Sequence, residues 1–265
     1  LLEERGELEN TIIAVTGDNG MPFPRAKANV YEIGMHVPLA VRWGAAVPGG
    51  RTVSDLVTFI DLAPTFLEAA SVSIPEDTTG RSLLSLLTSG GSGRIEASRN
   101  AAVTGRERHA YCRPNNVGYP IRCLRTDEFV YIRNFAPDRW PAGDPPVWGD
   151  IDGSPTKNCM IAHRDEAAVK PLFERAFGKR PAEELYAVDD GYACDRNLAG
   201  DPQHAETLRS LRKELALRLA EQEDPRIVGG GEEIDTYRYF GRTTDSEGNT
   251  AFTGTDSLRR AGLLE

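Results

Sequence analysis

A short apolar run near the start of the chain, residues 11–15, constrains the fold more than any other segment. Its β-branched residues, followed at once by a Gly-rich turn, are typical of a strand buried on both faces of a parallel sheet. Residues 1–10, with leucines among charged residues, resemble the end of a helix. A helix that leads into a buried strand indicates an α/β fold. A parallel sheet needs more strands than follow, so we expect the chain to begin in the middle of a domain.

The next segments extend this α/β pattern. Residues 37–43 are predicted to form a second strand, and residues 56–60 are strand-like. Asp61 is placed to cap a helix that runs to about Ala70. A further short helix is expected over residues 81–87.

From about residue 100 the pattern changes to a small antiparallel sheet. A short turn at residues 126–128 between two of the apolar segments is a hairpin signal. Leucines then recur at helical spacing and predict an amphipathic helix that packs on the sheet. The expected strands are residues 101–104, 121–125, 129–133 and 184–188, and the leucines are Leu208, Leu211, Leu215 and Leu219.

These patterns divide the chain into three predicted regions. Residues 1–98 belong to an α/β core, and residues 99–227 form the antiparallel subdomain with its helix. Residues 228–265, rich in Gly, Thr and charge, form an irregular tail.

The net charge of −9, from 31 basic and 40 acidic residues, argues against a nucleic-acid partner, which usually needs a basic face. No apolar run approaches the roughly 20 residues that span a bilayer, so no membrane helix is expected. An acidic protein can still bind an anionic substrate where a few Lys and Arg side chains converge. Of the four cysteines, Cys112 and Cys123 flank a loop and could form a disulfide, with small buried thiols as the alternative.

Asp18 and Asn19 follow the first predicted strand, at the carboxyl end where open α/β sheets place their ligand sites. A carboxylate beside an amide carbonyl supplies two hard oxygens, which suit Ca²⁺ or Mg²⁺. The alternative is a plain turn, because Asn-Gly is a favoured turn dipeptide.

Basic residues supply two further candidates. Lys27, in a Pro-rich loop, could neutralise charge on an oxyanion near a bound cation, or could be an ordinary solvated lysine. Arg106 and His109 lie in a cluster of ionisable residues after a strand. The guanidinium group of arginine can donate two parallel hydrogen bonds to a sulfate or carboxylate group. Histidine can transfer protons near neutral pH. A salt-bridged strand end is the alternative.

Taken in order, these motifs resemble the type I (formylglycine-dependent) sulfatase family. The Met-Pro-Phe-Pro run at residues 21–24 is most similar to the heparan N-sulfatases (sulfamidases) and their bacterial relatives. The segments that carry the resemblance are residues 10–20, Lys27, residues 31–34 and 37–38, residues 61–65 and 79–84, and residues 184–186 and 197–199 with the terminal helix.

The resemblance implies part of an alkaline-phosphatase-like α/β fold and hydrolysis of sulfate esters or sulfamates on glycosaminoglycan-like sugars. It makes Asp18 and Asn19 ligands of one calcium ion (Ca²⁺) and Lys27 a contact of the sulfate group. Arg106 and His109 then belong to the substrate pocket, with His109 as a catalytic candidate. Arg122, in a Tyr-Pro-x-Arg segment, is a candidate substrate-binding residue with a structural role as the alternative.

The resemblance also implies what this sequence lacks. The C/S-x-P-x-R motif that yields formylglycine is absent, as is the family's first pair of calcium-binding aspartates. We therefore expect a C-terminal portion that is inactive alone, from a periplasmic or secreted enzyme (lysosomal in an animal). The alternatives are a phosphodiesterase or phosphonate hydrolase of the same superfamily and a non-catalytic carbohydrate-binding paralogue. Asn19 favours calcium, because the two-metal relatives carry histidine there.

Overall fold

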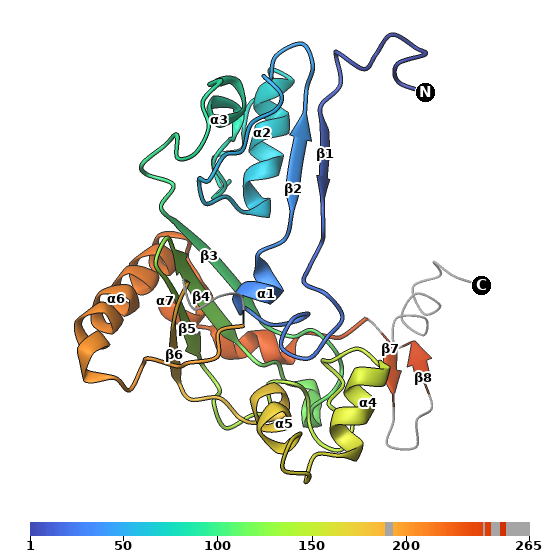
Figure 1. The fold of residues 1–265 in the computed structure, drawn as a ribbon, viewed down its shortest axis with the longest axis vertical. Helices are drawn as coiled ribbons and strands as arrows, with labels where there is room; N and C mark the ends of the chain where they lie inside the picture. Colours follow the sequence, from blue (N-terminus) through green and yellow to red (C-terminus); the bar gives the residue numbers. More distant parts are fainter. Residues whose placement is uncertain (189–192, 241, 245–249, 253–265) are drawn as a thin grey trace. The chain divides into compact units, whose positions relative to one another are not determined.

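The computed structural model describes residues 1–188 and 193–240, together with the backbone of two short strands, β7 (Arg242–Thr244) and β8 (Thr250–Phe252) (Figure 1). Much of the predicted tail, residues 228–265, therefore lies outside the described residues. The chain forms two compact units. The first comprises Leu1–Asp18, Val37–Thr104 and Leu124–Glu128, and the second comprises Asn19–His36, Gly105–Cys123 and Phe129–Glu265.

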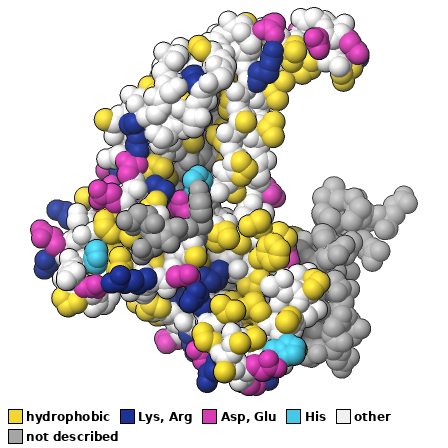
Figure 2. Space-filling model, viewed as in Figure 1, with side chains coloured by type: hydrophobic (Ala, Val, Ile, Leu, Met, Phe, Trp, Pro, Cys, Tyr) yellow, Lys and Arg dark blue, Asp and Glu magenta, His cyan; other side chains and the backbone are white. Residues whose placement is uncertain are grey.

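The first unit contains a two-stranded ribbon. Strand β1 (Ile13–Thr16) pairs antiparallel with β2 (Leu39–Arg42), with Ile13 opposite Arg42. Both predicted strands are confirmed, but the expectation of a parallel strand buried on both faces is wrong for the described residues. Val15 is 63% exposed, and hydrophobic side chains lie on the surface of this ribbon (Figure 2). Among the described residues β2 is the only strand that pairs with β1.

The predicted helix end at residues 1–10 is also wrong, since these residues form turns. Gly6 has a left-handed φ of 70°, which breaks a right-handed helix at that point.

Two helices of the first unit match the sequence pattern. Helix α2 (Leu62–Ala69) begins after Asp61, and α3 (Leu84–Thr88) covers most of the second predicted helix. The predicted strand at residues 56–60 is wrong, because its end forms a 3-10 turn, η1 (Phe59–Asp61). The Asp61 carboxylate accepts the Thr58 N–H at 3.2 Å, which closes a capping box instead of a strand ladder.

The larger sheet has the strand order β3-β4-β5-β6. Strand β5 pairs antiparallel with β6, with Phe129 opposite Ala187 and Arg133 opposite Glu183. All four predicted strands and the hairpin turn at residues 127–128 are confirmed. The strands are β3 (Ala101–Arg106), β4 (Ile121–Thr126), β5 (Phe129–Asn134) and β6 (Glu183–Ala187).

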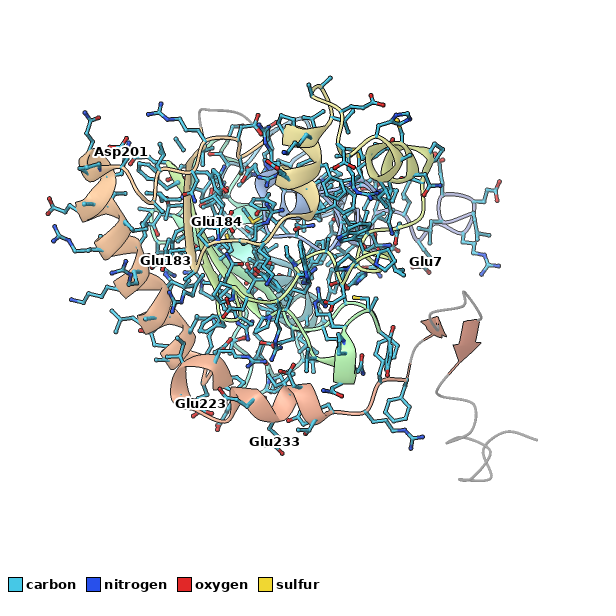
Figure 3. All side chains as sticks on the ribbon, turned by 90° about the horizontal axis from the view of Figure 1, so that it is seen from below. Glu7, Glu183, Glu184, Asp201, Glu223 and Glu233 are labelled. Atoms are coloured by element: carbon cyan, nitrogen blue, oxygen red, sulfur yellow. The ribbon has the colours of Figure 1, made fainter. Side chains whose placement is uncertain are left out.

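Strand β6 shows how the two faces of the sheet are used. Glu183 lies on the side of helix α6, where its carboxylate binds Arg212 at 2.6 and 2.7 Å (Figure 3). Glu184, the next residue, lies among buried side chains and accepts hydrogen bonds from Tyr31 (3.0 Å), Tyr186 (2.6 Å) and Asn134 (2.8 Å). A buried carboxylate with three donors fixes the segment that contains Tyr31 against the sheet.

Helix α6 (Ala205–Glu221) confirms the leucine pattern and packs on the sheet beside β5 (Figure 1). Its buried residues are Leu208, Leu211, Leu215 and Leu219.

Several short helices complete the second unit. Helix α4 (Pro155–Ala162) begins where a long loop was expected, and its start carries a standard signal that the prediction missed: Ser154 accepts the Lys157 N–H at 3.1 Å, with proline at the first helical position. The others are α1 (Glu32–Met35), α5 (Lys170–Phe177), α7 (Pro225–Val228) and the 3-10 turns η2 (Pro114–Asn116), η3 (Pro202–His204) and η4 (Gly231–Thr236).

Within the described part of the chain, no helix has the length and apolar character needed to cross a membrane. All four cysteines lie in this part and none is in a disulfide, so Cys112 and Cys123 are not bridged. Cys123 and Cys194 are buried, whereas Cys159 is exposed.

Candidate functional site

Lys27 lies in a compact loop of the second unit. The Lys27 N–H donates to the carbonyl oxygen of Met21 (3.0 Å), and the Gly20 N–H donates to that of Gly34 (3.1 Å). A Cβ atom on Gly20 would lie 2.7 Å from the Gly34 Cα, so the two ends of the loop approach this closely because Gly20 has no side chain. The loop therefore holds a closed conformation that presents Lys27.

Two residues that flank Lys27 have left-handed backbone angles, Arg25 (φ 66°) and Ala28 (φ 59°). Such angles in residues other than glycine cost free energy and persist where surrounding contacts hold them. Arg25 provides such contacts: its guanidinium stacks 3.7 Å from the centre of the Tyr31 ring and donates to the Cys194 carbonyl oxygen at 2.8 Å.

Asp18 and Asn19, the predicted metal ligands, are exposed consecutive residues, separated from the end of β1 by Gly17. The Asn19 amide nitrogen donates to the Gly20 carbonyl oxygen at 3.1 Å, which leaves the amide oxygen as the acceptor. One carboxylate and one amide oxygen fit a hard cation in kind. They are two of the six to eight oxygens that Ca²⁺ takes. Among the described residues no cluster of three or more His, Cys, Asp or Glu forms a metal site, so further ligands are needed.

The Lys27 ammonium pairs with Asp152, at 2.8 Å between Nζ and Oδ2. Both side chains are partly exposed, at 26% and 39%. His109 lies in the same electrostatic environment. Loss of solvation lowers its pKa, with Asp150 and Asp152 opposing this shift and Arg106 and Lys27 adding to it. The lowered pKa favours the neutral imidazole, which can accept a proton.

Arg106 lies at the end of β3 with its side chain 10% exposed. It donates to the carbonyl oxygens of Ala28 and of Pro141 (2.9 Å), and it lies 3.7 Å from the Asp150 carboxylate. Burial lowers its pKa, with Asp150 acting against this. Its hydrogen bond to the Ala28 carbonyl oxygen holds the Lys27 loop. Contact between Arg106 and substrate remains a prediction.

Known proteins resemble this chain over the same residues. Residues 25–139, which contain Lys27, Arg106 and His109, match the family described as N-sulphoglucosamine sulphohydrolase, C-terminal. The N-sulphoglucosamine sulphohydrolase of Homo sapiens is 31% identical over 245 residues, covering 84% of this chain and 44% of that protein. The chain belongs to the sulfatase family.

An ulvan-active sulfatase of Formosa agariphila is 28% identical over 218 residues, or 81% of this sulfatase chain and 34% of that protein. The chain thus spans less than half of the length of these relatives. A protein solved in complex with its substrate D-glucosamine-2-N,6-O-disulfate has the same fold (TM-score 0.57, 24% identity, 85% of this chain and 37% of that one). So does a phosphonate monoester hydrolase of Silicibacter pomeroyi (TM-score 0.56, 19% identity, 95% and 40%). The fold is that of the alkaline-phosphatase-like sulfatases.

Arg122, the remaining predicted residue of this sulfatase chain, lies in a different ion-pair cluster. It binds Asp224 (2.5 Å) and Glu107 (2.7 Å), and Glu107 also binds Arg226 (2.7 Å). These contacts occupy the Arg122 guanidinium, and they connect β4 to the segment after α6. Substrate binding by Arg122 remains a prediction, and the structure favours the structural role.

The charged groups around His109 balance one another. Two cations, Lys27 and Arg106, face two carboxylates, Asp150 and Asp152. With His109 neutral these groups carry no net charge, against −9 for the chain. Lys27 is the more exposed of the two cations, so it can attract an anion to an otherwise acidic protein.

The sequence interpretation missed Asp150, Asp152 and Arg113. The first two lie in Gly149-Asp150-Ile151-Asp152-Gly153, inside a region treated as a long loop. The available signal was a pair of acidic residues bounded by glycines in a loop. Loops carry binding and catalytic residues more often than other segments do.

Proposed function

We propose that this chain forms the C-terminal part of a sulfatase that hydrolyses sulfate esters or sulfamates on amino sugars of sulfated, glycosaminoglycan-like polysaccharides. The observation that carries the proposal is the cluster of Lys27, Arg106 and His109 inside the segment that matches the family. A sulfate monoester or sulfamate carries one negative charge and so complements the partly exposed Lys27 ammonium.

The substrate class rests on the printed functions of related proteins. One relative is an N-sulphoglucosamine sulphohydrolase, and one neighbour of the same fold was solved with a glucosamine that carries both N- and O-sulfate. A sulfated glucosamine is therefore the first substrate to test. The ulvan-active relative indicates that other sulfated polysaccharides belong in the same test.

In this proposal each candidate residue of the chain has a separate role. Lys27 offsets the charge on the sulfate oxygens, and its interaction strengthens as negative charge builds up on the departing group. His109, which faces the same cluster, exchanges a proton with the leaving oxygen or nitrogen. Asp18 and Asn19 would hold Ca²⁺, which supplies Lewis-acid stabilisation of a sulfate oxygen when bound. The nucleophile would come from residues outside this sequence, so the chain alone should be inactive.

The test uses the full-length protein with N-sulfoglucosamine, glucosamine 6-sulfate, a phosphonate ester and a phosphodiester. We expect sulfate release from at least one sulfated sugar and about one bound Ca²⁺ per protein, because amide and carboxylate oxygens favour calcium. Hydrolysis of the phosphorus esters with two bound zinc or manganese ions would identify a phosphoryl-transfer enzyme. Sugar binding without release of sulfate would identify a carbohydrate-binding protein.

Replacing Asp152 by asparagine should lower KM for the sulfated sugar by roughly three- to tenfold. The Asp152 carboxylate neutralises Lys27 in the free protein and repels the incoming sulfate, and partly exposed pairs of this kind are worth about 1 kcal/mol. Initial rates at low ionic strength measure the effect, which salt should reduce. Asp138→Asn, an exposed aspartate of the same unit, is the control. An unchanged or higher KM in Asp152→Asn would show that the carboxylate does not compete with substrate.

A further inference from the structure

Asp150 is a buried carboxylate whose contacts converge on one short segment. Its side chain is 1% exposed. Oδ1 accepts the Ala110 N–H at 3.0 Å, and Oδ2 accepts from the Arg113 guanidinium and lies 3.7 Å from that of Arg106. The Cys112 thiol also donates to it, and burial together with this carboxylate raises the thiol pKa to about 12. All these partners lie within residues 106–113.

The segment that carries His109 depends on such contacts for its shape. Between the end of β3 and the start of η2, residues 107–113 form no helix or strand beyond a single β-bridge residue, Tyr111. Ala110, whose N–H binds Asp150, is the residue directly after His109. A loop without its own hydrogen-bond ladder takes its conformation from side chains that satisfy its backbone. Asp150 supplies this backbone contact next to the imidazole.

Asp150 also acts on the other side of the cluster. It neutralises Arg106, and Arg106 donates to the Ala28 carbonyl oxygen, one residue from Lys27. One carboxylate thus holds the His109 segment directly and the Lys27 loop through Arg106. Two guanidiniums share this single negative charge, so its loss would leave both uncompensated in a buried environment.

We propose that Asp150 is a positioning residue that fixes His109 and the Lys27 loop relative to each other for sulfate transfer. The inference rests on the proposed function for its catalytic consequence. The physical link between Asp150 and His109 stands apart from that function and can be measured without turnover.

The charged groups that face His109 give the sign of the expected effect. They are Asp150 and Asp152, which favour the protonated imidazole, and Arg106 and Lys27, which disfavour it. Asp150→Asn keeps an oxygen that can accept the Ala110 N–H but removes the negative charge. The His109 pKa should therefore fall, and the limb of the kcat/KM profile that reports His109 should move to lower pH.

The experiment is an NMR titration of the four histidines in the full-length protein, with His109→Gln to assign the His109 signal. In Asp150→Asn we expect the His109 pKa to fall by about half a unit or more. In kinetic assays we expect kcat to fall at least tenfold, with a smaller change in KM. Asp224→Asn, which removes a carboxylate from the Arg122 ion pair of the same unit, controls for general loosening and should leave the His109 pKa in place.

If Asp150→Asn does not fold, Arg113→Gln tests the same link between Asp150 and His109. This variant leaves Asp150 less compensated, so the His109 pKa should rise. An unchanged His109 pKa in the folded variant would overturn the inference. A shifted pKa with unchanged kcat would overturn the positioning role. A shifted pKa in a protein that hydrolyses no sulfated sugar would confirm the link between Asp150 and His109 while rejecting the proposed function.

Discussion

Asp18→Ala in the full-length protein is expected to remove bound Ca²⁺ and to lower kcat/KM for a sulfated sugar by about a thousandfold. Asp18 is the charged member of the only ligand pair that we assign to this chain, and a calcium site that loses a carboxylate loses much of its affinity. The reaction then lacks the cation that stabilises charge on the sulfate group, and loss of one such electrostatic contact costs about 10² to 10³ in rate. Metal analysis and steady-state kinetics on the same preparation measure both effects.

The same variant should keep its fold, because Asp18 is exposed and has no hydrogen bond or ion pair with the described residues. Added Ca²⁺ should raise the Tm of the parent protein and leave that of the variant unchanged, since a ligand stabilises only the state that binds it. Asp77→Ala, an exposed aspartate of the same unit, is the matched control and should retain calcium and activity. Stoichiometric calcium and a near-normal rate in Asp18→Ala would exclude this residue as a ligand.

The predictions that succeeded rest on local patterns. The hairpin of β4 and β5 follows from two strand-like segments around a short turn, and α6 follows from four leucines at helical spacing. Both signals are complete within the segment itself, so no distant residue is needed to interpret them.

The predictions failed where contacts with residues distant in sequence determine the local structure. Residues 56–60 look like a strand by composition, but Asp61 closes a turn there and also binds the Arg81 N–H (2.8 Å) and Arg99 (3.0 Å). Val15 has the composition of a buried strand residue, yet the described chain provides only β2 beside it. Propensity cannot anticipate such tertiary contacts.

The candidate site shows the same division. Lys27, Arg106 and His109 were recognised from their motifs, and the structure brings them into one electrostatic cluster. Asp150 and Asp152 lie about 40 residues further along the chain, and only folding places them beside His109 and Lys27. Arg106 was predicted to bind substrate, whereas the structure shows its guanidinium donating to two carbonyl oxygens, contacts that depend on how the Lys27 loop closes. The chemical roles of these residues stay predictions, and the pairing of residues could not be read from the sequence.

Lys27→Ala should lower kcat/KM for the sulfated sugar by about 10²- to 10³-fold, the usual cost of removing one charged contact to a reacting group. The loss should exceed that of a simple deletion, because the Asp152 carboxylate is left unpaired where the sulfate must bind. Steady-state kinetics over a range of salt concentrations measures it. Circular dichroism should be unchanged, since the Lys27 ammonium makes its ion pair with a partly exposed side chain.

The double variant Lys27→Ala with Asp152→Asn separates the two contributions. It removes the unpaired carboxylate, so it should recover part of the activity lost in Lys27→Ala, and the non-additivity measures the coupling of the pair. Lys27→Arg keeps the charge and should retain more activity than Lys27→Ala, although the guanidinium presents its donors in a different geometry. If Lys27→Ala hydrolyses the sugar at the parent rate, or if the double variant is no better than Lys27→Ala, then sulfate does not bind at this lysine. The charged groups around His109 would then stabilise the loop that they hold together and not bind the substrate.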